Sequence, residues 1–365
     1  MKTIIIFCNS SWNIYNFRKN LIKTLQKKYR VITISGRDKF SKKITNLSKA
    51  YFVDLENRSV NFFKNIKEIF YLKKILNKYP DSIMLNFTNK SVILGSISIF
   101  FNKIEVINVV TGLGHAFLQK NFFVSLIIKF LYSLIVIRSK YIIVQNKFDK
   151  IFFEEKFFTK GKIKLIYGSG IDFTKFKVSR KKKINHTKTL LFFGRILREK
   201  GIFNFLEAAD YFKDKKDIKF KIVGQFNKKD FSSQEAKLLK KYSKFKNINF
   251  HNFSKNIFKI LDDSDCVVLP SYREGLSKTL LESTAMQKFV ICSDVPGCNE
   301  IVINNFNGFL IKPKNSNDLI LKIKKFLVIS KNKLNIMEKN SRARTYKLFR
   351  DNIVIDKYVK IINDI

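Results

Sequence analysis

Several residue types are scarce in this 365-residue chain, and each scarcity excludes a class of protein. Only 4 Pro and 13 Gly are present, too few for a collagen-like or low-complexity chain, and a hydrophobic content of 45% argues against general disorder. Because a single hydrophobic core rarely grows beyond roughly 250–300 residues, the length predicts two domains.

Cysteine and histidine are also rare, with 4 and 3 residues. The cysteines form no CxxC motif and mostly lie in or beside apolar runs, which predicts reduced core thiols in a cytosolic protein. They are Cys8, Cys266, Cys292 and Cys298. The histidines are far apart and lack HxH or HxxxH spacing, so we expect no metal site. We expect no bound cofactor either. They are His115, His186 and His251.

Acidic residues are also few, since 29 Asp and Glu stand against 71 Lys and Arg and leave a formal net charge of +42. The excess is mostly Lys in a chain also rich in Ile, Asn and Phe, a bias typical of AT-rich genomes. Such a charge attracts nucleic acid, anionic lipid and phosphorylated small molecules alike. Because no RRM, KH, zinc-finger or helix-turn-helix signature is present, nucleic acid is the minor candidate.

No apolar run is long enough to cross a bilayer. The longest, residues 122–137, falls short of the roughly 20 residues that a span needs and contains Lys129. It predicts either a core helix, which we favour, or a helix lying in a membrane interface between flanking cations. The N-terminal run TIIIFC lacks a cleavage signature and fits a buried strand better than a signal peptide.

Short continuous apolar runs alternate with helical patterns in both halves of the chain. The runs include TIIIFC at 3–8, RVITIS at 30–35 and SIMLNF at 82–87, then TLLFFG at 189–194, FKIVG at 220–224 and CVVLPS at 266–271. Runs of this kind between helices predict parallel strands covered on both faces, hence two Rossmann-like domains. The polar, cationic segment 179–187 is the best linker, which gives domains of 1–178 and 188–345 and a final helix at 346–365.

Candidate chemistry lies where these strands end, because ligands of such sheets bind there. After the strand ending at Gly194, the cations Arg195 and Lys200 precede a helix whose amino-terminal end favours phosphate. After the strand CVVLPS, Glu274 lies in a loop and Glu282 on the following helix, a pair suited to accept hydrogen bonds from sugar and ribose hydroxyls. Backbone amides at that helix start could contact phosphate too. They belong to Gly275, Leu276 and Ser277.

Two segments of the first half add to this set. The loop VTGLGHAF contains Gly112 and Gly114, which permit unusual backbone geometry, followed by His115, a candidate active-site residue. The first strand ends in small polar residues, Ser10 and Ser11 among them. In isolation each segment also fits a structural interpretation: a charged loop, dipole-favourable surface Glu residues, or a structural His.

Together these segments resemble the family 4 retaining glycosyltransferases of the two-Rossmann-domain (GT-B) type. The resemblance rests on Glu274 and Glu282 in an E-x7-E arrangement, on Arg195 and Lys200 in GRxxxxKG, and on the flanking VLPSYREGLSKTLLE. Further segments such as NFTNKS at 86–91, YGSGIDFTKF at 167–176 and SDVPGCNEIV at 293–302 are similar to a narrower branch. That branch transfers sugars, often N-acetylhexosamines or uronic acids, to undecaprenyl-diphosphate-linked acceptors in polysaccharide or glycan assembly.

The resemblance implies a fold, a reaction and roles for residues. The two domains would face each other across a cleft, and the last helix would cross back to the first domain. Arg195 and Lys200 would bind the diphosphate of a UDP-sugar in place of a metal, while Glu274 contacts the donor sugar, Glu282 the ribose, and His115 lies near the reacting carbon. Further donor-site residues would be Ser10, Ser11, Gly112, Gly114, Gly194, Gly275, Leu276 and Ser277.

One departure from the family pattern follows the second glutamate, where relatives usually have AMAxGxP and this chain has STAMQKFVI. Since Gln287 replaces a glycine that ends the helix, we expect altered geometry there. The preferred interpretation is a cytoplasmic glycosyltransferase peripherally bound to the anionic inner face of the plasma membrane. The alternatives are an inactive relative that binds membrane or nucleic acid through its basic surface, and a phosphorylase or epimerase of the same fold.

Overall fold

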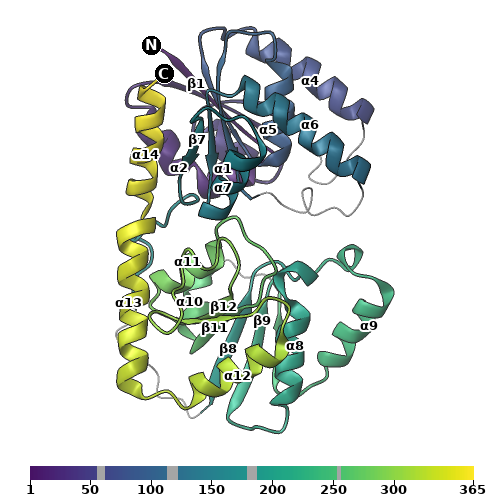
Figure 1. Ribbon diagram of the computed structural model, residues 1–365, viewed down its shortest axis with the longest axis vertical. Helices are drawn as coiled ribbons and strands as arrows, with labels where there is room; N and C mark the ends of the chain where they lie inside the picture. Colours follow the sequence, from purple (N-terminus) through teal and green to yellow (C-terminus); the bar gives the residue numbers. More distant parts are fainter. Residues whose placement is uncertain (56–61, 113–121, 179–186, 253–255) are drawn as a thin grey trace. The chain divides into compact units, whose positions relative to one another are not determined.

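The computed structural model describes residues 1–55, 62–112, 122–178, 187–252 and 256–365, and the chain divides into two compact units (Figure 1). Unit 1 comprises Met1–Gly170 and Asp351–Ile365, and unit 2 comprises Ile171–Arg350. Of the expected linker, 179–187, residues 179–186 lie outside the described residues.

The described part of unit 1 contains a seven-stranded parallel sheet in the order β3-β2-β1-β4-β5-β6-β7. Its central strands are continuous runs of buried apolar residues because helices cover both faces. The strands are β1 (Thr3–Cys8), β2 (Arg30–Gly36), β3 (Lys49–Val53), β4 (Ile83–Phe87), β5 (Glu105–Val110), β6 (Tyr141–Val144) and β7 (Ile163–Leu165).

Alternate residues of β1 point to opposite faces and join different cores. Ile4 and Ile6 pack against one set of helices that includes the C-terminal one, whereas Ile5 and Phe7 pack toward the other set. The first set comprises α1 (Ser11–Phe17), α2 (Lys19–Leu25), α3 (Ser41–Thr45) and α14 (Asp351–Asn363). The opposite face is covered by α4 (Phe62–Leu76), α5 (Asn89–Ser98), α6 (Phe122–Arg138) and α7 (Lys147–Lys156).

The described part of unit 2 contains six parallel strands in the order β10-β9-β8-β11-β12-β13. They are β8 (Lys188–Phe193), β9 (Ile218–Val223), β10 (Ile248–His251), β11 (Cys266–Leu269), β12 (Phe289–Ser293) and β13 (Phe309–Ile311). The α-helices are α8 (Ile202–Tyr211), α9 (Ser233–Tyr242), α10 (Ile257–Asp262), α11 (Lys278–Ala285), α12 (Ser316–Leu327) and α13 (Lys331–Phe349), and two short 3-10 helices are η2 (Arg198–Lys200) and η3 (Lys228–Asp230).

The division between the units differs from the boundaries expected at residues 178 and 346. The chain passes from unit 1 to unit 2 at Gly170–Ile171 and returns at Arg350–Asp351. Phe349 is buried within unit 2, and the N–H of Ile171 donates to its carbonyl oxygen. Arg350 is extended, with φ −64° and ψ 146°, and therefore separates α13 from α14. Of the two C-terminal helices, α13 belongs to unit 2 and only α14 belongs to unit 1. Figure 1 shows α14 beside α2.

The first helical region also begins earlier than its pattern suggests. The sequence predicts a helix from about residue 15 to 28, whereas α1 starts at Ser11 because the hydroxyl of Ser10 accepts from the N–H of Asn13. Arg18 then interrupts the region between α1 and α2.

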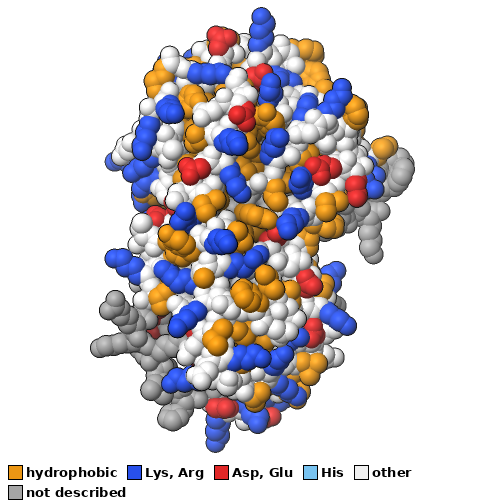
Figure 2. Space-filling model, turned by 60° about the vertical axis from the view of Figure 1, so that its left-hand side comes forward, with side chains coloured by type: hydrophobic (Ala, Val, Ile, Leu, Met, Phe, Trp, Pro, Cys, Tyr) orange, Lys and Arg blue, Asp and Glu red, His pale blue; other side chains and the backbone are white. Residues whose placement is uncertain are grey.

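On the face drawn in Figure 2, basic side chains are spread out rather than gathered at one place. Lys and Arg lie on both units there, with few Asp and Glu between them (Figure 2). This distribution agrees with a compositional origin for much of the charge. None of the described helices is long and apolar enough to span a bilayer.

Candidate active site

The candidate residues of unit 2 meet at a topological switch point. Strands β8 and β11 are neighbours at the centre of the sheet, and the chain leaves them toward opposite edges. At such a point the loops beyond the carboxyl ends of the strands separate and leave a crevice for ligands. The loop after β8 contains Gly194, Arg195 and Lys200, and the loop after β11 contains Glu274.

An ion pair joins these two loops. Nζ of Lys200 lies 2.5 Å from Oε1 of Glu274, and both side chains are largely buried, with exposed fractions of 23% and 10%. The hydroxyl of buried Ser271 donates to the same carboxylate oxygen at 2.8 Å. Glu274 is therefore held in place from two directions.

Two glycines allow the loops to approach this closely. Gly201 has φ +76°, and a Cβ at that position would lie 2.0 Å from the carbonyl oxygen of Pro270. Gly297 has φ +79°, and its Cβ would lie 2.6 Å from the carbonyl oxygen of Gly275. Both positions combine a left-handed backbone with no room for a side chain, so they require glycine. Gly297 belongs to SDVPGCNEIV, one of the segments on which the family resemblance rests. This segment therefore packs directly against the loop that carries Glu274.

Helix α11 begins beside the ion pair. Ser277 caps it, with its hydroxyl accepting from the N–H of Leu280, and its own N–H donates to the carbonyl oxygen of Gly297. The hydroxyl of Thr279 donates to the carbonyl oxygen of Phe193 at 3.2 Å, which ties the helix to the end of β8. The positive end of the helix dipole therefore lies at the edge of the sheet where Gly275 and Leu276 were predicted to contact phosphate.

The two arginines after β8 have different surroundings. Arg198 forms an ion pair with Glu235, which belongs to the first turn of α9. Arg195 is exposed to solvent, and the described residues provide it with no ion-pair partner. Of these two guanidinium groups, Arg195 is therefore the one available to an anion.

Glu282 lies on α11, five residues beyond Ser277, and is half-buried. Burial raises the pKa of its carboxyl group, and the positive charge of Lys278 opposes that rise. Its charged form is thus costly in the folded protein until a hydrogen-bond donor arrives.

The candidate residues of unit 1 follow β1 and β5. The hydroxyl of Ser10 caps α1, and the hydroxyl of buried Ser11 contacts Ser35 Oγ, the carbonyl oxygen of Gly36 and Ser41 Oγ within 3.1 Å. Gly112 has φ +120°. A ligand that binds Ser11 would therefore have to replace an existing hydrogen bond. Gly114 and His115 lie outside the described residues.

The expected change of geometry after α11 does not occur. Gln287 has φ +57°, the left-handed conformation that a glycine would adopt. The N–H of Gln287 donates to Thr284 and that of Lys288 to Ser283, the pair of bonds that usually ends a helix at glycine. The sequence-based expectation was wrong because the hydrogen bonds preserve the turn, leaving the strain in the backbone of Gln287.

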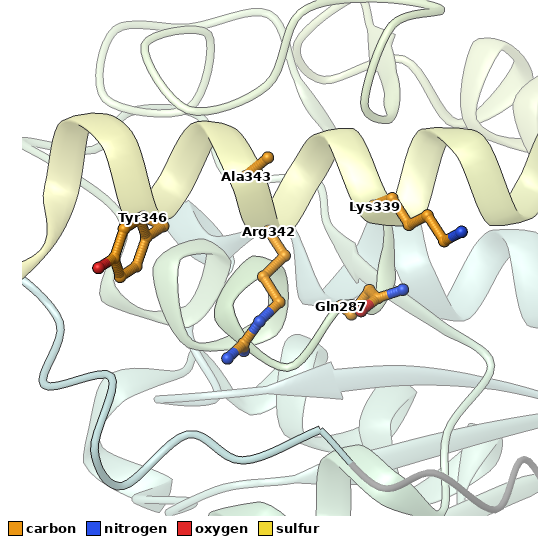
Figure 3. A pocket seen from close by; sticks show the side chains of 5 residues that line it. All are labelled: Gln287, Lys339, Arg342, Ala343 and Tyr346. Atoms are coloured by element: carbon orange, nitrogen blue, oxygen red, sulfur yellow. The ribbon is translucent and has the colours of Figure 1, made fainter.

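A hollow of about 370 Å³ lies over this turn, away from the ion pair. Figure 3 shows Lys339, Arg342, Ala343 and Tyr346 on α13, with Gln287 opposite them. The guanidinium of Arg342 donates to the carbonyl oxygens of Phe176 and Ala285. Because these bonds already engage the guanidinium of Arg342, we interpret the hollow as a result of how α13 packs on the end of α11 and not as a ligand site.

Sequence reasoning missed three residues that shape the site, namely Ser271, Thr279 and Gly297. Ser271 and Thr279 stood within the motif VLPSYREGLSKTLLE. The partner of Thr279, Phe193, is 86 positions away. Ser271, by contrast, bonds to Glu274 three positions later within the motif itself. Among the described residues, no three His, Cys, Asp or Glu side chains are grouped closely enough to hold a metal ion.

Comparison with known proteins identifies relatives over nearly the whole chain. Residues 174–344 match the family model described as glycosyl transferases group 1. An N,N'-diacetylbacillosaminyl-diphospho-undecaprenol alpha-1,3-N-acetylgalactosaminyltransferase from Campylobacter jejuni is 29% identical, with coverage of 96% of this chain and 95% of that protein. A UDP-Gal:alpha-D-GlcNAc-diphosphoundecaprenol alpha-1,3-galactosyltransferase from Escherichia coli is 31% identical, with coverage of 85% and 82%.

The fold is shared with solved structures. HepE from Anabaena, in complex with UDP, superposes with a TM-score of 0.80 at 16% identity, and each chain is covered completely. The predicted fold class, two Rossmann-like domains with a C-terminal helix that returns to the first, is confirmed by the two parallel sheets and by the place of α14 in unit 1.

Proposed function

The chain belongs to the group 1 glycosyl transferases, and from this membership we propose that it transfers a sugar from a UDP-sugar to an undecaprenyl-diphosphate-linked saccharide, with retention. Both relatives compared above carry diphospho-undecaprenol or diphosphoundecaprenol acceptors in their names, and one of them names a UDP-sugar donor. The observation that carries the proposal is the joining of Lys200 and Glu274 at the switch point, beside the amino-terminal end of α11.

In this proposal unit 2 holds the donor. The diphosphate lies against Arg195, Lys200 and the start of α11, where two cations and the helix dipole oppose its negative charge. The same groups stabilise the charge that develops on the diphosphate as the glycosidic bond breaks, in place of a metal ion.

The two glutamates act on hydroxyl groups. Glu274, fixed by Ser271, accepts hydrogen bonds from the donor sugar, and Glu282 accepts them from the ribose. Folding removes water from the carboxylate of Glu282, which destabilises its charged form in the free protein. Hydrogen bonds from the ribose hydroxyls replace part of that lost solvation.

The acceptor determines where the enzyme works. A saccharide on undecaprenyl diphosphate stays in a bilayer, so we place the enzyme on the cytoplasmic, anionic face of the plasma membrane, in polysaccharide or glycan assembly. The net charge of +42 favours such a surface.

Thermal unfolding with UDP, GDP, ADP and a panel of UDP-sugars tests the donor site, because a ligand that binds only the folded state raises the Tm. We expect a selective rise with UDP and one UDP-sugar that is unaffected by EDTA. The rise should be lost in Arg195→Ala and kept in Arg198→Ala, the matched control whose guanidinium is engaged by Glu235. A folded protein that responds to no nucleotide would contradict the proposal.

A further inference from the structure

Helices α5 and α6 leave an apolar surface outside the core of unit 1. Seven large hydrophobic side chains are exposed there, up to 91% for Phe101 and 62% for Phe130. We define them as the α5–α6 face; they are Ile97, Phe100, Phe101, Leu126, Ile127, Phe130 and Ile137. Figure 1 shows the two helices next to each other on one side of the sheet.

The spacing along α6 explains why this surface exists. Tyr132 and Val136 are buried with the core of unit 1, and they occupy one side of the helix. Residues 127, 130, 134 and 137 recur at intervals of three and four and so share the other side. Because α6 is apolar on both sides, packing one side on the sheet leaves the other uncovered.

An apolar groove of about 340 Å³ connects the two helices. It is lined by Ile93, Ser96, Ile97, Phe100, Phe101, Leu131, Leu134 and Ile135. The one polar side chain among them, Ser96, already accepts a hydrogen bond from buried Asn108. Water in this groove would find few hydrogen-bond partners, whereas a hydrocarbon chain needs none.

The surface is preformed rather than loosely attached. The guanidinium of Arg138, at the end of α6, donates to the carbonyl oxygens of Ile99, Asn102 and Ile104 at 3.1, 2.6 and 2.6 Å. These bonds lock the turn that carries Phe100 and Phe101 against α6. They also engage Arg138 within the fold, so this flanking cation is structural.

Charge around the face selects among occupants. Residues 89–138, from the start of α5 to the end of α6, contain a single acidic residue, Glu105, and five basic ones. Those basic residues are Lys90, Lys103, Lys120, Lys129 and Arg138. A second copy of the chain would bring the same positive charge to the contact, whereas an anionic bilayer complements both the charge and the apolar surface.

We infer that the α5–α6 face inserts into an anionic lipid bilayer and that its groove holds a hydrocarbon chain of a bilayer lipid. The proposed function requires contact with a membrane, and this inference names the residues that make the contact. The inference therefore rests on the proposed function. Exposed lysines such as Lys103 and Lys129 contact headgroups, while the apolar side chains enter the hydrocarbon boundary.

The first test is co-sedimentation of the full chain with vesicles of equal parts phosphatidylglycerol and phosphatidylcholine. The variant Phe101→Ser/Phe130→Ser should lower vesicle partitioning at least tenfold, and its Tm and its response to UDP should stay unchanged. The matched control is Leu321→Ser, on α12 of unit 2, because Leu321 is 61% exposed and Phe130 is 62% exposed. This control should bind like the wild type.

The second test detects insertion directly. The chain has a single tryptophan, Trp12, so Phe130→Trp in a Trp12→Phe background provides one reporter. Its emission should shift to the blue and be quenched by brominated lipid, and Leu321→Trp should show neither effect. Wild-type vesicle binding by the double serine variant, an unquenched reporter, or a change from dimer to monomer in that variant would each overturn the inference. Failure of the proposed function would differ, because the wild type would then not respond to UDP.

Discussion

Nζ of Lys200 lies 2.5 Å from Oε1 of Glu274, although the two residues are 74 positions apart in the sequence. Both belong to loops that leave adjacent central strands, β8 and β11. In the free protein the cation expected to bind phosphate is thus neutralised by the carboxylate expected to bind sugar. A donor diphosphate has to compete with Glu274 for Lys200.

This competition predicts opposite effects of two substitutions on UDP affinity. Lys200→Ala removes a charged hydrogen bond and should weaken UDP binding roughly tenfold to a hundredfold, since such bonds contribute about 1.5–3 kcal/mol. Glu274→Gln releases the ammonium group and should bind UDP at least as tightly as the wild type, while turnover with the UDP-sugar falls. Isothermal titration calorimetry and a transfer assay measure the two effects. Weaker UDP binding in Glu274→Gln would show that the ion pair does not compete with the donor.

The raised pKa of Glu282 predicts a pH dependence of stability. Because the folded-state pKa lies above the ordinary 4.5, the native state binds more protons than the unfolded state in that window, and stability falls as pH rises through it. Glu282→Gln removes this loss, so it should raise the Tm at neutral pH by an amount that shrinks below pH 4.5.

Glu154→Gln is the control for that experiment. Glu154 lies in an exposed pair with Lys150, with 42% of its side chain accessible. Its substitution should leave the Tm nearly unchanged at every pH, because exposed pairs contribute little. An equal pH profile for both variants would rule out burial of Glu282 as the cause.

The left-handed backbone of Gln287 predicts a stabilising substitution. A side chain in that conformation costs about 1–2 kcal/mol, so Gln287→Gly should raise the free energy of unfolding by about 1 kcal/mol after the greater chain entropy of glycine is subtracted. Urea unfolding measures the change. Asn305→Gly provides the comparison, since Asn305 has φ +63° and asparagine tolerates this region well. No gain in Gln287→Gly would mean that its side chain offsets the strain.

The buried hydroxyl of Ser11 predicts a defect in stability rather than in donor binding. Ser11→Ala leaves partners of that hydroxyl unsatisfied and should lower the free energy of unfolding by about 1–3 kcal/mol. The UDP affinity of the folded protein should stay within twofold of wild type. Selective loss of UDP affinity at unchanged stability would instead support a ligand contact of Ser11.

Much of the fold was predictable because it depends on local pattern. Continuous apolar runs such as TIIIFC and CVVLPS became buried parallel strands, since only a sheet covered on both faces can bury every residue of such a run. The division between the units was less accessible. It depends on the burial of Phe349 and its bond to Ile171, which involve residues far apart in sequence.

The sequence by itself determined which residue types stand at the strand ends: a Gly-Arg-Lys loop after β8 and a Glu-Gly-Leu-Ser loop after β11. Only the tertiary structure decided that these two loops lie side by side and that Lys200 pairs with Glu274. It also decided that positions 201 and 297 require glycine. The physical reason is that chain direction and burial follow from local hydrophobic periodicity, whereas hydrogen bonds and close approaches between distant loops arise only once the sheet has set their separation.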